Sequence, residues 1–374
     1  MDFLDIVKAI FHKVGADIEL EKEATKVSKL LKEKNKTVFI LVDGMGALLI
    51  KRLVPNSFLD KSIREVATTI FPSTTSVVLT SLATGKYPQE HSVNGWFSYI
   101  EDTDESIIGL PFVDRFDYDK KLQVNFNDVF FGESLFGKVN CPVSVITKTD
   151  IAKSDYSKWF RADAKVYPYR TLKGAFQTLS KIITKNSENE FIYLYIDDFD
   201  SLCHKCGPDS EEAKVLLEKI NDHIEKIAKM HSGKANIIIT ADHGQVTIEN
   251  KNFFVINNQD EMMKLLKSPP SGDSRFVCFH VKEECKEEFI KLFNKRYGDY
   301  ARLISQKELN DMRLLGKEEM TSKAKSRYGD FCALFNKGYA FSYQNGNINR
   351  KKLNKGCHSG DTDEEMKIPL IIIN

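Results

Sequence analysis

Six side chains that can bind metal ions stand where apolar runs end or where glycine-flanked loops begin. Carboxylates and imidazoles together suit zinc or a similar divalent ion. Six such ligands are enough for two metal ions that keep open positions, which two-metal phosphoryl chemistry requires. Taken singly, an aspartate here is explained as a helix cap or turn residue, and a histidine as a surface or core residue. The predicted ligands are Asp43, Asp200, His204, Asp242, His243 and His358.

A hydroxyl-rich stretch, FPSTTSVVLTSLATG at residues 71–85, offers candidate nucleophiles. A hydroxyl group is a poor nucleophile at neutral pH, but metal coordination can lower its pKa. The pattern predicts a helix that begins at the hydroxyl cluster and ends at Gly85. The free N–H groups at its start would hold a phosphoryl oxygen. The residues alone leave seven candidates: Ser73, Thr74, Thr75, Ser76, Thr80, Ser81 and Thr84.

The strands that must position these groups are short, continuously apolar runs, which are typical of a buried parallel sheet. Helical patterns lie between them, so we expect an α/β fold with a doubly wound, mostly parallel sheet. Functional groups in such sheets gather at the carboxyl ends of the strands, where the predicted ligands fall. The runs are TVFILV (37–42), CPVSVIT (141–147), FIYLYI (191–196), NIIIT (236–240) and PLIII (369–373).

The chain divides into a short N-terminal part and a large catalytic part. Residues 1–34 have the apolar spacing of two helices, and we interpret them as an N-terminal helical extension that packs on the core or on a partner. Residues 35–374 form the predicted catalytic domain. Within it, residues 250–345 mix helical and strand patterns around a PPSGD turn, and we expect a smaller inserted α+β subdomain there.

Composition excludes several classes of protein. The net charge is +1, from 54 basic and 53 acidic residues, which argues against binding to duplex nucleic acid or to a membrane surface. The apolar runs are too short to span a bilayer, and the N-terminus lacks the pattern of a signal peptide. Seven cysteines, of which only Cys203 and Cys206 form a C-x-x-C in a turn, favour a reducing compartment. We therefore expect a cytoplasmic protein, with export by a non-standard route left open.

Five motifs in order resemble the nucleotide pyrophosphatase/phosphodiesterase family of the alkaline phosphatase superfamily. The resemblance spans most of residues 38–374 and implies an alkaline-phosphatase-like catalytic domain. Any one motif is weak evidence, but five that carry a full ligand set are specific. The motifs are LVDGMG (41–46), FPSTTSVVLTSLATGKYPQEHSVNGW (71–96), DSLCHKCGPD (200–209), TADHGQ (240–245) and GCHSG (356–360), followed by EMKIPLII.

The resemblance implies roles for single residues. Thr75, the last threonine of F-P-x-x-T, takes the role of the nucleophile. One metal ion would be held by Asp43, Thr75, Asp242 and His243, and the other by Asp200, His204 and His358. Zinc is the usual occupant of both sites. His91, after the nucleophile helix, is not a metal ligand in the family.

The implied reaction is hydrolysis of a phosphodiester or pyrophosphate bond in a small molecule, with a nucleotide as the expected substrate. Thr75 would form a covalent threonyl-phosphoryl intermediate. The chain departs from the family pattern at Ser76, where an aromatic residue is usual, and at Val78, where an asparagine is usual. Predicted substrate contacts are therefore the Ser76 N–H, Trp96 and Arg115, with core packing as the competing explanation for the aromatic residues nearby.

Other functions remain as alternatives. The same metal site could hydrolyse phosphomonoesters, phosphonates or sulfate esters, although no extra metal ligands or sulfatase cysteine motif are found in the sequence. A non-catalytic binding module would be expected to lose ligands, and a purely structural α/β protein would need the whole set by chance. The oligomeric state is not determined by the sequence.

Overall fold

The computed structural model describes residues 1–185 and 189–374, and its larger lobe is built on a seven-stranded sheet. The strand order is β2-β18-β9-β1-β8-β6-β7, and the five strands from β9 to β7 are parallel. This confirms the predicted doubly wound, mostly parallel sheet. The strands are β1 (Lys36–Val42), β2 (Ile63–Thr68), β6 (Val143–Lys148), β7 (Lys165–Tyr169), β8 (Glu190–Ile196), β9 (Asn236–Thr240) and β18 (Lys367–Ile373).

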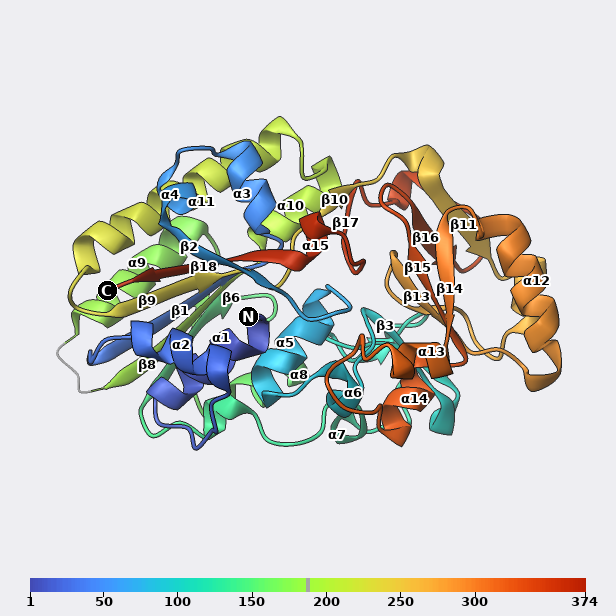
Figure 1. Ribbon diagram of the computed structural model, residues 1–374, viewed down its shortest axis with the longest axis horizontal. Helices are drawn as coiled ribbons and strands as arrows, with labels where there is room; N and C mark the ends of the chain where they lie inside the picture. Colours follow the sequence, from blue (N-terminus) through green and yellow to red (C-terminus); the bar gives the residue numbers. More distant parts are fainter. Residues whose placement is uncertain (186–188) are drawn as a thin grey trace.

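Helices cover both faces of this sheet (Figure 1), which explains why its central strands are apolar on both sides. All seven residues of β1 are buried. One face carries α3 (Ala47–Leu53), α4 (Phe58–Ser62), α9 (Leu172–Thr184), α10 (Asp198–Cys206) and α11 (Glu211–His231). The other carries α1 (Phe3–Lys13), α2 (Lys22–Leu30), α5 (Thr75–Thr84) and α8 (Asp155–Arg161).

The N-terminal helix α1 belongs to this core. Its apolar residues Phe3, Val7, Ile10 and Phe11 are buried. The Phe11 ring lies 5.1 Å from Phe136 and 5.3 Å from Phe191, centroid to centroid. Of the two arrangements that the sequence leaves open for residues 1–34, the structure has the one in which they pack on the core.

The smaller lobe holds an antiparallel sheet with the order β14-β15-β13-β12-β3-β4-β5. Residues 250–345 therefore share their sheet with strands that lie far earlier in the chain. The segments join where Gly272 pairs with Phe97. The strands are β3 (Phe97–Ile100), β4 (Glu105–Ile108), β5 (Val113–Asp114), β12 (Ser271–Gly272), β13 (Phe276–Phe279), β14 (Ala301–Ser305) and β15 (Phe331–Phe335).

Shorter elements complete the two lobes. In the smaller lobe, α12 (Lys286–Tyr297) packs on a separate apolar core that includes Phe279, Phe289 and Phe293. Within the described ranges, no helix has the length and apolarity needed to cross a membrane. Other short elements are α6 (Pro88–His91), β10 (Val246–Thr247), β11 (Phe253–Asn257), β16 (Ala340–Gln344), β17 (Gly356–Cys357) and α15 (Asp363–Met366).

Candidate active site

Three carboxylates lie at the carboxyl ends of three neighbouring strands. Asp43 follows β1, Asp242 follows β9, and Asp200 lies in the first turn of α10, directly after β8. Because β9, β1 and β8 are adjacent and parallel, these three ends meet at one edge of the sheet. Gly44 turns the chain sharply after Asp43 with a φ of 72°, a conformation that favours glycine.

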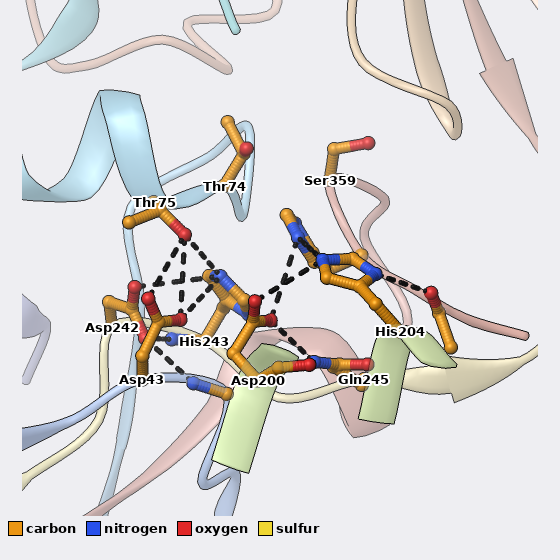
Figure 2. Close-up of polar contacts among 12 residues, drawn as sticks. Asp43, Thr74, Thr75, Asp200, His204, Asp242, His243, Gln245 and Ser359 are labelled. Carbon is orange, nitrogen blue, oxygen red and sulfur yellow. Dashed lines mark hydrogen bonds and ion pairs between the residues drawn. The ribbon is translucent and has the colours of Figure 1, made fainter. Parts of the chain in front are cut away.

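The six predicted metal ligands gather into two groups, and the ligand atoms of each group lie within 4.8 Å of one another. Asp43, Asp242 and His243 form the first group. Asp200, His204 and His358 form the second, with His204 Nε2 lying 3.3 Å from both Asp200 Oδ2 and His358 Nε2. In Figure 2 the Thr75 hydroxyl points toward Asp43 and His243 of the first group, and Asp200 and His204 of the second group lie beside them. The six aspartate and histidine side chains thus divide into the same two groups that the family resemblance implies.

Hydrogen bonds at the far side of each imidazole fix which nitrogen faces the site. The Nδ1 atoms of His204, His243 and His358 lie 2.7, 2.9 and 3.1 Å from the backbone oxygens of Gly356, Gly244 and Ser73. If each Nδ1 donates, each Nε2 presents a lone pair to the site, as a metal ligand does. The buried Asp242 Oδ2 has no hydrogen-bond partner among the described residues. These donors fit a pair of divalent ions.

The crowding of buried charges perturbs the titration of this site. Burial and the neighbouring Asp242 raise the pKa of Asp43 well above its usual range. Burial opposes protonation of His204, but the adjacent Asp200 raises the pKa of that imidazole to about 9. Burial and the adjacent His243 hold the pKa of His358 well below its usual value. A divalent cation favours charged carboxylates and neutral imidazoles, the forms in which these groups bind metals.

Of the seven candidate hydroxyls, that of Thr75 lies against the ligand groups. Its Oγ1 is 3.1 Å from His243 Nε2 and 3.4 Å from Asp43 Oδ1. Five of the others are engaged elsewhere, and the buried Ser76 hydroxyl has no hydrogen-bond partner among the residues described. The five partners are Gly360 O for Ser73, Asp273 for Thr74, Ser76 O for Thr80, His91 for Ser81 and Thr80 O for Thr84.

Helix α5 begins at Thr75, within the hydroxyl cluster where the sequence predicts a helix start, and ends before Gly85, which has the left-handed conformation. Thr74 is the N-cap residue, but its side chain makes no capping hydrogen bond. Within the described ranges, the amides of Thr75 and Ser76 have no backbone partner, whereas Val77 and Val78 both donate to Thr74 O. The two free amides can therefore donate to an anionic oxygen placed above the helix start.

Two residues that sequence reasoning missed orient the carboxylates. The Tyr195 hydroxyl donates to Asp43 Oδ2 at 2.5 Å, and Gln245 Nε2 donates to Asp200 Oδ1 at 2.5 Å. In the sequence, the apolar run around Tyr195 indicates only another core residue of β8. Gln245 belongs to the TADHGQ motif, and its polar side chain next to a predicted ligand pair is the signal that could have revealed it.

A third missed residue comes from the smaller lobe. Asp273 lies in the PPSGD segment, which the sequence identifies only as a turn. Its Oδ2 accepts a hydrogen bond from Thr74 Oγ1 at 2.7 Å, and its Oδ1 accepts one from Ser274 N at 2.7 Å. Burial raises the pKa of this carboxyl above its usual value. No local pattern could show that this turn reaches the start of α5.

Two cavities meet at the candidate nucleophile. An apolar cavity of about 310 Å³ opens beside Asp43, and a cavity of about 490 Å³ lies between the lobes beside His204 and His358. Thr75, Trp96, Asp200 and Ser201 line both of them. The apolar cavity is also lined by Leu79, Leu110, Val145, Ile151, Tyr156 and Phe160. The inter-lobe cavity is also lined by Phe97, Arg115, Ser271, Asp273, Tyr343 and Lys352.

The three predicted substrate contacts lie at different places. Trp96, with 36% of its surface exposed, stands in the wall shared by both cavities. Arg115 lines the inter-lobe cavity. The Ser76 side chain is buried, so its backbone amide is the group that faces the site. The nearby aromatic residue Phe112 packs against Phe126 with a centroid distance of 5.1 Å.

The profile of the family described as "Type I phosphodiesterase / nucleotide pyrophosphatase" matches residues 37–361. Ectonucleotide pyrophosphatase/phosphodiesterase family member 7 of Mus musculus is 33% identical over 94 residues. That match covers 22% of this chain and only 21% of the relative.

Solved structures share the fold. Murine ectonucleotide pyrophosphatase / phosphodiesterase 5, in an inactive form in complex with AMP, aligns with a TM-score of 0.65 and 15% identity, over 91% of this chain and 87% of that one. Phosphonoacetate hydrolase from Sinorhizobium meliloti 1021, in complex with phosphonoformate, aligns with a TM-score of 0.63 and 16% identity, over 91% of each chain. At such identities the likeness concerns the fold alone.

Proposed function

The chain belongs to the type I phosphodiesterase / nucleotide pyrophosphatase family, and from this premise we propose that it hydrolyses a phosphodiester or pyrophosphate bond in a small molecule. The observation that carries the proposal is the position of the Thr75 hydroxyl, 3.1 Å from His243 Nε2 and beside two groups of metal ligands. A nucleotide is the expected substrate. The complex of the murine relative with AMP supports that expectation.

Two divalent ions, with zinc as the expected metal, would be held by the two ligand groups. They would lower the pKa of the attacking hydroxyl and neutralise charge at phosphorus. Thr75 Oγ1 forms a bond to phosphorus while the bond to the leaving oxygen breaks, and that oxygen takes the electron pair. The hydroxyl proton faces Asp43 and His243, the acceptors within 3.5 Å. Water then hydrolyses the threonyl-phosphoryl intermediate.

The start of α5 supplies the remaining contacts to the phosphoryl group. The Thr75 and Ser76 amides donate to its non-bridging oxygens, at the positive end of the helix dipole. Two cavities meet at Thr75, and each can accept one substituent of a phosphorus atom. This arrangement supports a substrate whose phosphorus carries two substituents. This favours diesters over monoesters, which carry a single substituent.

A substitution of the nucleophile tests the proposal. Thr75→Ala is expected to lower turnover of bis(4-nitrophenyl) phosphate by about 10²–10⁴, the range of a single catalytic group. Thr84→Ala removes a hydroxyl from the other end of the same helix, where it bonds to Thr80 O, and serves as the matched control. Wild-type turnover by Thr75→Ala would overturn the mechanism. A large preference for 4-nitrophenyl phosphate would instead favour the alternative of a phosphomonoesterase on the same site.

A further inference from the structure

Arg115 is a half-buried cation that has no acidic partner among the described residues. It follows β5, and its guanidinium carbon lies 3.8 Å from the centre of the Phe97 ring. Phe116 and Tyr343 lie further out, at 5.3 and 5.4 Å. The single hydrogen bond found for its guanidinium in the described parts of the chain runs from Nη1 to Pro270 O, at 2.6 Å. No carboxylate of the described residues forms an ion pair with it.

This isolation is unusual for a guanidinium. Loss of hydration lowers the pKa of Arg115 to about 10, and the nearby Tyr343 hydroxyl acts against that effect. Buried charges in proteins are ordinarily paired, because an unpaired one loses its hydration without compensation. Stacking on aromatic rings recovers part of the loss. A guanidinium has five N–H donors, so most of its hydrogen-bonding capacity is unused here.

The surroundings of Arg115 favour an anion in the inter-lobe cavity. Lys352 adds a second cation to the lining. The acids in the same lining are Asp200, which is a predicted metal ligand, and Asp273, whose two oxygens already accept hydrogen bonds from Thr74 and Ser274. A ligand with a negative charge would therefore meet two cations that form no ion pair with any described residue.

The position of the cavity relative to the nucleophile indicates which part of a substrate enters it. Thr75 lies against Asp43 and His243, and Asp43 lines the apolar cavity. His204 and His358 line the inter-lobe cavity instead. In an in-line displacement the leaving oxygen departs opposite the attacking one, and in a two-metal site the second ion stabilises it. With a second ion held by Asp200, His204 and His358, the leaving group would depart on the side of the inter-lobe cavity.

We propose that Arg115 forms an anion-binding subsite in the inter-lobe cavity and that the leaving group of the natural substrate carries its own negative charge, as a phosphate or carboxylate. The inference rests on the proposed hydrolytic function. Arg115 and Lys352 bind the anion while the Thr75 Oγ1–phosphorus bond forms and the bond to the leaving oxygen breaks. The guanidinium lies over the Phe97 ring with Nη1 bonded to Pro270 O, and its Nη2 and Nε donors remain for contact with such an anion.

Matched substrates test the subsite. Methyl 4-carboxyphenyl phosphate and methyl 4-carbamoylphenyl phosphate have leaving groups of similar shape that differ in charge, and ADP provides a phosphate leaving group. Arg115→Gln is expected to lower kcat/KM about tenfold or more for the charged leaving groups, the loss of one charge-assisted contact. It should change the neutral substrate by about twofold or less. A loss confined to ADP would identify phosphate, rather than carboxylate, as the anion.

Controls separate the subsite from other effects. Arg115→Lys keeps the charge and should recover part of the loss, whereas Arg302→Gln makes the same change in β14, where the guanidinium contacts Met312. Equal losses of kcat/KM on the charged and neutral substrates would overturn the proposal of an anion-binding subsite. If Thr75-dependent hydrolysis of the neutral diester persists in that case, the proposed function still stands.

Anion binding by the subsite can also be measured without turnover of a substrate. Titration of the metal-loaded protein with inorganic pyrophosphate should show affinity about tenfold weaker for Arg115→Gln than for the wild type. Melting temperatures of both proteins verify that the variant is folded. Equal affinities of two folded proteins would overturn the subsite.

Discussion

The Thr74 hydroxyl donates a hydrogen bond to the Asp273 carboxylate at 2.7 Å, across 199 positions of sequence. Thr74 is the N-cap of α5 and precedes the candidate nucleophile, while Asp273 belongs to the smaller lobe. The Thr74 hydroxyl bonds to Asp273 and does not cap the helix, and the amides of Thr75 and Ser76 have no backbone partner in the described ranges. The smaller lobe thus contacts the start of α5 directly.

This contact predicts coupled effects on catalysis. Thr74→Val and Asp273→Ala should each lower kcat/KM on bis(4-nitrophenyl) phosphate by about tenfold, because a hydrogen bond to a charged group is worth about 1.5–3 kcal/mol. The double variant should lose little more than either single one. Thr74→Ser keeps the hydroxyl and should retain most of the activity. Losses that simply add would show that the two residues act independently.

The two ligand groups predict two metal ions per chain. Extensive dialysis against a chelator should abolish turnover and lower the melting temperature, because the buried carboxylates then repel one another without a cation. Added zinc should restore both. Elemental analysis should find about one metal ion fewer in Asp200→Asn than in the wild type. Asp209→Asn, in the same sequence motif but paired with Arg52, is the control that should keep both ions.

A buried ion pair between the lobes supports the loop that carries His358. Arg275 Nε donates to Glu365 Oε1 at 2.6 Å, and that carboxylate also accepts a hydrogen bond from Gly360 N. Both side chains are fully buried. Arg275→Met should therefore lower the free energy of unfolding by about 3–5 kcal/mol, since Glu365 is left without its partner.

Urea denaturation measures that effect. Arg296→Met breaks a partly exposed pair with Asp260 and Glu261, and it should cost about 1 kcal/mol or less. A second change, Glu365→Leu, added to Arg275→Met should recover part of the loss, because it removes the unpaired charge. An Arg275→Met protein as stable as the wild type would contradict the importance of the pair.

His91 predicts a dependence of stability on pH. Burial lowers its pKa to about 3, and its Nδ1 accepts a hydrogen bond from Val93 N. In the unfolded chain the pKa is 6.5, so between pH 6.5 and pH 3 the unfolded state binds the additional proton. Because of His91, the free energy of unfolding should fall by up to about 1.4 kcal/mol for each pH unit below 6.5.

The contribution of His91 can be isolated by substitution. Unfolding free energies at pH 7.5, 6.0 and 5.0 should show a shallower decline for His91→Gln than for the wild type. The two slopes of unfolding free energy against pH should differ by close to the effect of one bound proton, whatever the stability of the variant at neutral pH. Identical slopes would mean that His91 does not stay neutral in the folded protein.

Local patterns in the sequence predict the elements that carry the ligands. The apolar runs at 37–42, 191–196 and 236–240 lie within β1, β8 and β9, because a strand buried on both faces must be continuously apolar. The start of α5 at Thr75 and its end at Gly85 follow from equally local features. Adjacent parallel strands then bring Asp43, Asp200 and Asp242 to one edge of the sheet.

Contacts between segments far apart in sequence were decided only by the tertiary structure. The joining of β3 to β12, the bond from Thr74 to Asp273 and the isolation of Arg115 beside Phe97 depend on how the second lobe packs. The sequence of a turn such as PPSGD does not indicate which distant segment the turn contacts in the folded chain. The sequence by itself determined which residues are candidate metal ligands and candidate nucleophiles, because periodicity and motifs are local. The folded chain decided the walls of the two cavities, because packing between lobes is not encoded by any local pattern.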